Sequence, residues 1–229
     1  MPQPPVLLVH GFASSYERNW REPGWVDILD DEGRDVIGFD LPGHGEADKP
    51  HDPEAYADME QAVVAALPKD HQVDAIGFSL GGQLLLKVAA ENPTRFRRIV
   101  VGGVGDNIFR HDDPEAAARA IESGTASEGD PAVAQAFSVF AKAPGNDPAA
   151  LAACLRRPRS PLSPGDLATV TVPVLVVLGD KDFAGPADKL MAALPDAKLE
   201  TLTGADHFGT PKDFRFIEAA MKFIRDEVA

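Results

Sequence analysis

Residues 77–81 read Gly77-Phe78-Ser79-Leu80-Gly81, between the apolar run Val73-Asp74-Ala75-Ile76 and a helical pattern over Leu80–Glu91. This order predicts a strand, a tight turn and a helix, with Ser79 at the turn. A glycine on either side of such a turn avoids side-chain clashes. The first amides of the helix would face negative charge that develops beside the serine. We therefore predict that Ser79 is a nucleophile, and we prefer this to a simple glycine-rich turn.

Apolar segments of strand length alternate along the chain with helical segments. The predicted strands are Val6–His10, Asp35–Asp40, Val73–Phe78, Arg98–Val101, Val174–Gly179 and Ala197–Thr201. The predicted helices between and after them are Pro53–Leu67, Leu80–Glu91, Pro186–Leu194 and Phe214–Glu227. Several strands are almost continuously apolar, which is typical of a parallel sheet covered on both faces. The pattern predicts an α/β fold, a mostly parallel sheet flanked by helices.

Residues 106–171 interrupt this alternation, because no convincing strand occurs among them. Their helical segments are Pro114–Ser123, Pro131–Lys142 and Pro148–Arg156, each preceded by an aspartate that suits a helix cap. We predict a small helical lid insertion over 106–171. The core of the single domain would then consist of residues 1–105 and 172–229.

The composition of the chain indicates which kinds of binding partner and which cellular compartment to expect. The 229 residues include 22 Lys+Arg and 36 Asp+Glu, a formal net charge of −14, which disfavours nucleic acid and anionic membrane surfaces as partners. The single cysteine, Cys154, excludes an intrachain disulfide and a cysteine metal site. The first residues lack the pattern of a signal peptide, and no apolar run reaches membrane-spanning length. A cytoplasmic protein is the expectation.

A serine hydroxyl needs a base, and the base needs an orienting acid. His207, in Gly204-Ala205-Asp206-His207-Phe208, follows the last predicted strand and is the best-placed histidine. Asp182 follows the apolar strand before it and is the preferred acid, with Asp180 and Asp106 as alternatives. Ser79, Asp182 and His207 occur in the chain order that is typical of α/β-sheet serine hydrolases. Each follows a predicted strand, so all three are expected at the carboxyl ends of the parallel strands, where open α/β sheets bind ligands.

The remaining candidates would stabilise charge or bind substrate. The backbone amides of Leu80 and Phe12 are the expected oxyanion donors. The aromatic candidates for lining a substrate pocket are Trp20, Phe109, Phe137, Phe140, Phe183 and Phe208. The insertion also holds arginines that would suit a substrate carboxylate, although solvated helix charges are the simpler interpretation; they are Arg110, Arg119, Arg156 and Arg157.

Taken in order, these segments resemble the α/β-hydrolase superfamily over nearly the full length of the chain. The matching motifs are His10-Gly11-Phe12, Asp40-Leu41-Pro42-Gly43-His44-Gly45, Gly77-Phe78-Ser79-Leu80-Gly81-Gly82, Pro173–Asp182 and Gly204–His207. The resemblance implies a Ser/Asp/His triad, no cofactor or metal, and a lid formed by the helical insertion. The first strand would correspond to the third of a full eight-stranded family sheet, so the early antiparallel strands are expected to be missing. In the family the turn containing His44 is structural.

A serine at the nucleophile position argues against the dehalogenases and epoxide hydrolases of this fold, which need a carboxylate there. The default expectation is a carboxylesterase that acts on a small-molecule acyl substrate through an acyl-enzyme. Hydrolysis of a C–C bond, lactone or thioester, and cofactor-free peroxidation, are alternatives within the fold. A hydrolase-like small-molecule receptor or signalling protein is the alternative from another class. The oligomeric state is left open.

Overall fold

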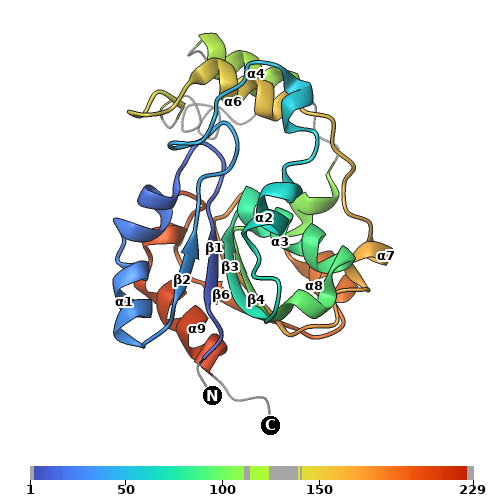
Figure 1. Cartoon of the computed structure of the whole chain (residues 1–229). Coiled ribbons are helices and arrows are strands. Elements are labelled where there is room, and N and C mark those ends of the chain that lie inside the picture. Colours follow the sequence, from blue (N-terminus) through green and yellow to red (C-terminus); the bar gives the residue numbers. More distant parts are fainter. Residues whose placement is uncertain (1–2, 111–113, 124–138, 140, 226–229) are drawn as a thin grey trace.

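The computed structural model describes residues 3–110, 114–123, 139 and 141–225. Six strands form one sheet in the order β2-β1-β3-β4-β5-β6, and every neighbouring pair is parallel (Figure 1). The strands are β1 (Val6–Val9), β2 (Val36–Gly38), β3 (Val73–Phe78), β4 (Phe96–Gly102), β5 (Val174–Gly179) and β6 (Ala197–Leu202). The predicted α/β fold with a parallel sheet is thereby confirmed.

Helices bury both faces of this sheet. On one face lie α2 (Glu60–Ala66), α3 (Leu80–Glu91), α7 (Pro164–Leu167) and α8 (Asp188–Ala193); on the other lie α1 (Trp25–Asp31) and α9 (Phe214–Arg225). Successive β1 residues alternate between the two cores, with Leu7 and Val9 in one and Val6 and Leu8 in the other. Each of the four is fully buried, which stabilises the fold by about 1.5–3 kcal/mol per side chain.

The segment after Phe12, expected to be a loop, is helical instead. It forms a π-helix over Glu17–Arg21 and then α1. Trp20 and Trp25 are fully buried and their rings pack edge to face, 5.2 Å apart, while Trp25 also contacts Phe216 of α9 at 4.8 Å. The prediction that Trp20 lines the substrate pocket is therefore wrong. The two indole rings therefore stabilise the fold by covering one face of the sheet, and they do not close a site.

Two predicted helices have different boundaries in the structure. The segment expected to form one helix over Pro53–Leu67 is divided into a 3-10 turn, Pro53–Tyr56, and α2. The Tyr56 hydroxyl donates to the Pro50 carbonyl at 2.6 Å, which holds this turn apart from α2. Helix α8 begins at Asp188 and not at Pro186, because the distant Asp106 carboxylate accepts its first free amides.

Residues 106–171 contain α4 (Pro114–Ser123) and α6 (Pro148–Arg156), which lie together above the carboxyl ends of the strands (Figure 1). Arg156 of α6 joins them by ion pairs to Glu115 at 2.8 Å and Glu122 at 2.6 Å on α4. Most of the expected helix Pro131–Lys142 lies outside the described residues. Among the helices that are described, none has the length and apolarity that crossing a bilayer requires.

Candidate active site

Ser79 occupies the turn between β3 and α3 in an unusual backbone conformation. Its φ is +50° and its ψ is −114°, a region that L-residues adopt at a cost on the order of 1–3 kcal/mol. The turn is held from β4, because the Ser79 amide donates to the Gly102 carbonyl at 2.8 Å. The serine is thereby fixed at the carboxyl end of the sheet, on the first residue before a helix.

The glycines on both sides of Ser79 are required by close backbone contacts. A Cβ atom at Gly81 would lie 2.2 Å from the Val9 carbonyl oxygen, and one at Gly77 would lie 2.7 Å from the Gly82 nitrogen. Real Cβ atoms do not approach backbone atoms so closely. Helix α3 can therefore begin directly against the end of β1 only because these positions carry no side chain.

The structure brings together the three side chains that the sequence singled out. His207 Nε2 lies 3.0 Å from Ser79 Oγ, and His207 Nδ1 lies 2.9 Å and 3.0 Å from the two Asp182 oxygens. Asp182 follows β5 and His207 follows β6, so both reach the same sheet edge as Ser79. With Asp182 accepting from Nδ1, the Nε2 atom is left to accept the serine proton. The arrangement can support nucleophilic catalysis by the serine.

The surroundings of His207 keep water away and fix the ring. The Asp182 side chain is fully buried and accepts a further hydrogen bond from the Ala184 amide at 2.8 Å. The His207 ring lies 4.3 Å from the Phe183 ring and 4.9 Å from the Phe78 ring. A charge pair that forms on His207 and Asp182 during reaction would thus be poorly screened by solvent and strongly attractive.

The three other aspartates near the site have separate roles. Asp106 accepts the Lys189 and Leu190 amides at 2.9 Å and 3.1 Å and so caps α8. Asp180 accepts the Gly204 amide at 2.7 Å, and Asp206 accepts the Gly209 amide at 2.8 Å. These contacts order the loops that carry Asp182 and His207. None of the three carboxylates is hydrogen-bonded to the His207 ring within the described part of the chain.

Two hollows adjoin the predicted oxyanion donors. One, of about 100 Å³, is lined by Ser79, His207, Phe12 and Phe208. The other, of about 180 Å³, is lined by Leu80 and Phe183 together with charged side chains. Phe12 therefore borders the hollow that contains Ser79, and Leu80 borders the other one. The amide contacts themselves stay a prediction, since they would form with a bound substrate.

The aromatic candidates divide into distinct environments. Phe183 and Phe208 line the hollows, whereas Phe109 packs against the hydrophobic core and is absent from both linings. Phe137 and Phe140 lie outside the described residues. No group of three or more His, Cys, Asp or Glu side chains that would hold a metal ion occurs in the described ranges.

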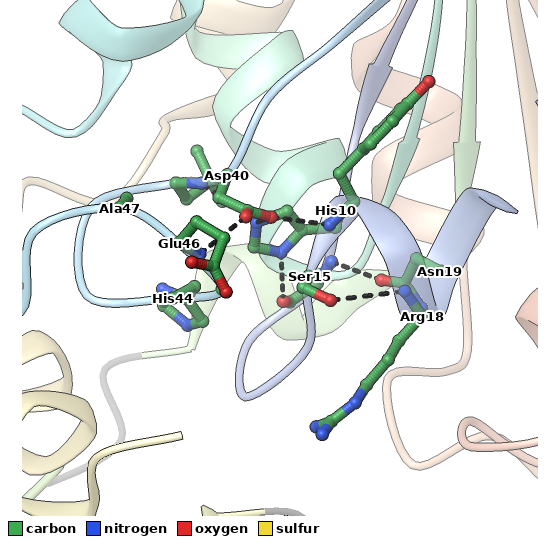
Figure 2. A network of polar contacts seen from close by, with 12 residues as sticks. His10, Ser15, Arg18, Asn19, Asp40, His44, Glu46 and Ala47 are labelled. Carbon is green, nitrogen blue, oxygen red and sulfur yellow. Dashed lines mark hydrogen bonds and ion pairs between the residues drawn. The ribbon is translucent and has the colours of Figure 1, made fainter. Parts of the chain in front are cut away.

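A polar network behind Phe12 was not identified from the sequence. The Gly11 amide donates to Asn19 Oδ1 at 2.8 Å, and the Asp40 carboxylate accepts the Tyr16 amide at 2.7 Å and the Glu46 amide at 2.8 Å. Figure 2 shows Asp40 and Asn19 on opposite sides of His10, with the loop after β1 between them. This network fixes the loop that carries Phe12. Nothing in the local sequence marks Asn19, because its partner is a backbone amide eight residues away.

Two buried histidines complete the network. His10 Nε2 accepts the Leu41 amide at 2.9 Å, while its Nδ1 lies 2.8 Å from the Gly11 carbonyl, so the ring is neutral. The His44 ring lies 5.3 Å from the His10 ring and 5.6 Å from the Phe12 ring. Burial lowers the pKa of His10, and burial together with the positive charge of neighbouring groups lowers the pKa of His44 to about 3. The sequence-based choice to leave His44 out of the catalytic set agrees with this packing role.

With this geometry in place, comparisons with known proteins identify the family. The model of the alpha/beta hydrolase family matches residues 6–219, and the chain therefore belongs to that family. An uncharacterised protein of Mycobacterium tuberculosis is 27% identical over 261 residues, covering 96% of this chain and 75% of that protein. A haloalkane dehalogenase of Psychrobacter cryohalolentis is 33% identical over 110 residues, covering 43% of this chain and 33% of its own. The solved structure of a thermophilic esterase from Thermogutta terrifontis superposes with a TM-score of 0.68 at 25% identity, covering 97% of this chain and 89% of that one.

Proposed function

We propose that this protein is a carboxylic ester hydrolase in which Ser79, His207 and Asp182 form a catalytic triad. The observation that carries the proposal is the continuous set of contacts from Ser79 Oγ through the His207 ring to the buried Asp182 carboxylate, each 3.0 Å or shorter. Such contacts are the geometric requirement for an activated serine. The similarity to an esterase fold over nearly the whole chain supports the same reaction class.

The reaction would proceed in two halves. His207 Nε2 takes the proton of Ser79 as Oγ attacks the ester carbonyl, and the Leu80 and Phe12 amides stabilise the oxyanion. Collapse of the tetrahedral intermediate breaks the bond to the alcohol, which leaves with the proton from His207. A water molecule then loses its proton to His207 and attacks the acyl-enzyme, releasing the acid and restoring Ser79.

The identity of the nucleophile separates this proposal from dehalogenation. The dehalogenases of this fold attack with a carboxylate, and this chain has serine at the turn between β3 and α3. Attack of Ser79 on an alkyl halide would displace the halide and form an alkyl ether, which water does not cleave under mild conditions. The similarity to a haloalkane dehalogenase therefore concerns the fold, while the nucleophile favours acyl transfer.

We further propose that the part of residues 106–171 that carries α4 and α6 acts as a lid and that the substrate is a small molecule. Helices α4 and α6 lie above the carboxyl ends of the strands (Figure 1). The hollow that contains Ser79 has a volume of only about 100 Å³, which fits a part of a small ester and not a macromolecular chain. A lid over this hollow would shield the acyl-enzyme from bulk solvent.

A fluorophosphonate probe tests the nucleophile directly. Mass spectrometry of the labelled protein is expected to find the phosphonate on Ser79 alone, and 4-nitrophenyl acetate is expected to show a burst of nitrophenol followed by steady turnover. Ser79→Ala should abolish labelling and reduce turnover by about 10⁴-fold or more. Labelling elsewhere, or unchanged hydrolysis by Ser79→Ala, would reject the proposed mechanism.

A further inference from the structure

The hollow beside Leu80 lies between the core and the segment that returns the chain from α6 to the sheet. Leu80 and Lys87 of α3 form one wall, and residues 157–162 form the opposite wall. Phe183, whose ring packs on His207, closes one end. The hollow therefore begins one residue from the nucleophile and extends away from it under the return segment, which is visible in Figure 1 between α6 and α7.

This hollow is positively charged although the protein is strongly acidic. Its lining includes four cationic side chains and a single carboxylate, whereas the whole chain has a formal net charge of −14. The carboxylate, Glu60, forms an ion pair with Lys87. The other cationic side chains of the lining are those of Arg110, Arg157 and Arg159. An excess of positive charge at one concave site on an acidic protein attracts anionic ligands to that site.

The structure separates the four arginines that the sequence offered as carboxylate partners. Arg119 forms an ion pair with Glu115 within α4, while Arg156 of α6 forms ion pairs with Glu115 and Glu122 and so joins α6 to α4. Neither lines the hollow.

Arg110 and Arg157 differ from Arg119 and Arg156 both in their position and in their hydrogen-bond partners. They line the hollow, and their guanidinium groups donate to backbone carbonyls: Arg110 to Phe183 and Gly185 at 3.1 Å and 3.0 Å, and Arg157 to Cys154 at 2.7 Å. No carboxylate in the described residues forms an ion pair with either one. Neutral partners orient a guanidinium while leaving its charge and its remaining N–H groups available to a ligand.

The position of His207 decides which part of a substrate occupies this hollow. The leaving alcohol must receive its proton from His207 Nε2, and His207 lines the smaller hollow, together with Ser79 and Phe208. The leaving group therefore belongs on that side. The acyl chain would then extend past Leu80 toward Arg110 and Arg157.

We infer that the protein prefers acyl groups that end in an anionic group, such as the half-esters of aliphatic dicarboxylic acids, with the distal carboxylate bound by Arg157 and Arg110. This inference rests on the proposed esterase function and specifies its substrate class. A carboxylate is flat and accepts two parallel hydrogen bonds, which matches the donor geometry of a guanidinium. A neutral acyl chain of equal length would leave the arginines without that partner.

Two esters that differ only at the chain end provide the test. The 4-nitrophenyl half-ester of adipic acid carries a carboxylate where 4-nitrophenyl hexanoate carries a methyl group. For the wild-type protein, kcat/KM should be higher for the adipate half-ester. Arg157→Gln should lower the ratio of the two kcat/KM values by about 10- to 100-fold, the range expected for loss of a hydrogen bond between charged groups. Arg110→Gln should also lower this ratio. In both variants, kcat/KM for the hexanoate ester should change by less than about 3-fold.

Arg119→Gln is the matched control, because Arg119 is an exposed lid arginine outside the hollow. It should leave the ratio unchanged. Protection of Ser79 from fluorophosphonate labelling is a readout that needs no turnover. Adipic acid monoamide should protect the wild-type protein at a lower concentration than hexanamide does. In Arg157→Gln the difference between the two protecting concentrations should be smaller.

The outcomes distinguish the two proposals. Equal kcat/KM for the two esters in wild type, or an equal loss for both in Arg157→Gln, would overturn the preference while leaving the esterase intact. Equal protection by the two amides would overturn it as well. Activity that survives Ser79→Ala would instead reject the esterase mechanism. Raising salt from about 0.05 M to about 0.5 M should reduce the wild-type ratio, because charge attraction is screened.

Discussion

Replacing His44 tests whether the buried histidines behind Phe12 lower the free energy of unfolding at acidic pH. The His44 ring is fully buried, its Nδ1 lies 2.9 Å from the Pro42 carbonyl, and its Nε2 has no hydrogen-bond partner in the described part of the chain. Protonation would therefore place an unpaired N–H and a positive charge in the interior. Burial opposes this protonation most, and the positive charges of Arg157 and Lys49 oppose it further. His44→Asn removes the titrating group and retains a donor for the Pro42 carbonyl.

The magnitude follows from the difference between the folded and unfolded pKa of His44. The folded pKa is about 3, and the reference value is 6.5. Below pH 6.5 the unfolded chain binds a proton that the folded protein does not, so the free energy of unfolding falls as the pH falls. At about pH 5 this costs about 2 kcal/mol, and the figure hardly changes for any folded pKa below about 4. The lowered pKa of His10 adds to the loss in the same direction.

Urea unfolding at about pH 7.5 and about pH 5 measures this directly, with fluorescence of the buried Trp20 and Trp25 as the probe. Between the two pH values, wild type should lose about 2 kcal/mol more stability than His44→Asn. Titrating groups distant from His44 contribute equally to both proteins and cancel in the comparison. His71→Asn, a change at an exposed histidine, should behave as wild type does. If wild type and His44→Asn lost stability in parallel, the buried-histidine explanation would be refuted.

Two further changes test the turn and the triad. Asp182→Asn should reduce kcat for nitrophenyl esters by about 10⁴-fold through the wrong His207 tautomer, whereas Asp106→Asn should cost about 1 kcal/mol of helix-cap stability in urea unfolding and leave most activity. If only Asp106→Asn were inactive, the acid would be misassigned. Gly81→Ala places a Cβ 2.2 Å from the Val9 carbonyl and should cost about 1–3 kcal/mol and slow fluorophosphonate labelling. Gly165→Ala, where the nearest atom would be 3.5 Å away, should do neither.

The sheet was predictable because its signal is local. Each strand is a short apolar run, and burial on both faces requires such runs wherever helices cover a parallel sheet. The turn at Ser79 was equally predictable, because the pattern that indicates it, a serine with glycine on both sides between a strand and a helix, is local. Chain order then placed His207 and Asp182 at the same sheet edge. These features need no knowledge of which distant segments meet.

The errors arose where distant contacts decide the structure. The position of Trp20 in the segment after Phe12, expected to be a loop, predicts a pocket residue, and only its packing on Trp25 shows that it belongs to the core. The start of α8 depends on the Asp106 carboxylate, which lies 83 residues away from the first amide it accepts. Likewise, the four arginines of the insertion are indistinguishable in sequence. Their separation into ion-paired and cavity-lining groups depends on where α4, α6 and the return segment pack.

The contacts between the lid and the loop after β1 bear on which kinetic step lid substitutions should affect. Ala13, directly after the predicted oxyanion donor Phe12, has a φ of +56°, a conformation that costs an alanine on the order of 1–2 kcal/mol. Its carbonyl accepts a hydrogen bond from Asn146 at 2.9 Å, and Arg18, in the π-helix that follows the loop, donates to the Pro144 carbonyl. Residues just before α6 thus help to hold the strained loop that positions Phe12. Because an oxyanion donor acts in the transition state, weakening these contacts should lower kcat and not only raise KM. The lid is therefore expected to contribute to the chemical step as well as to substrate enclosure.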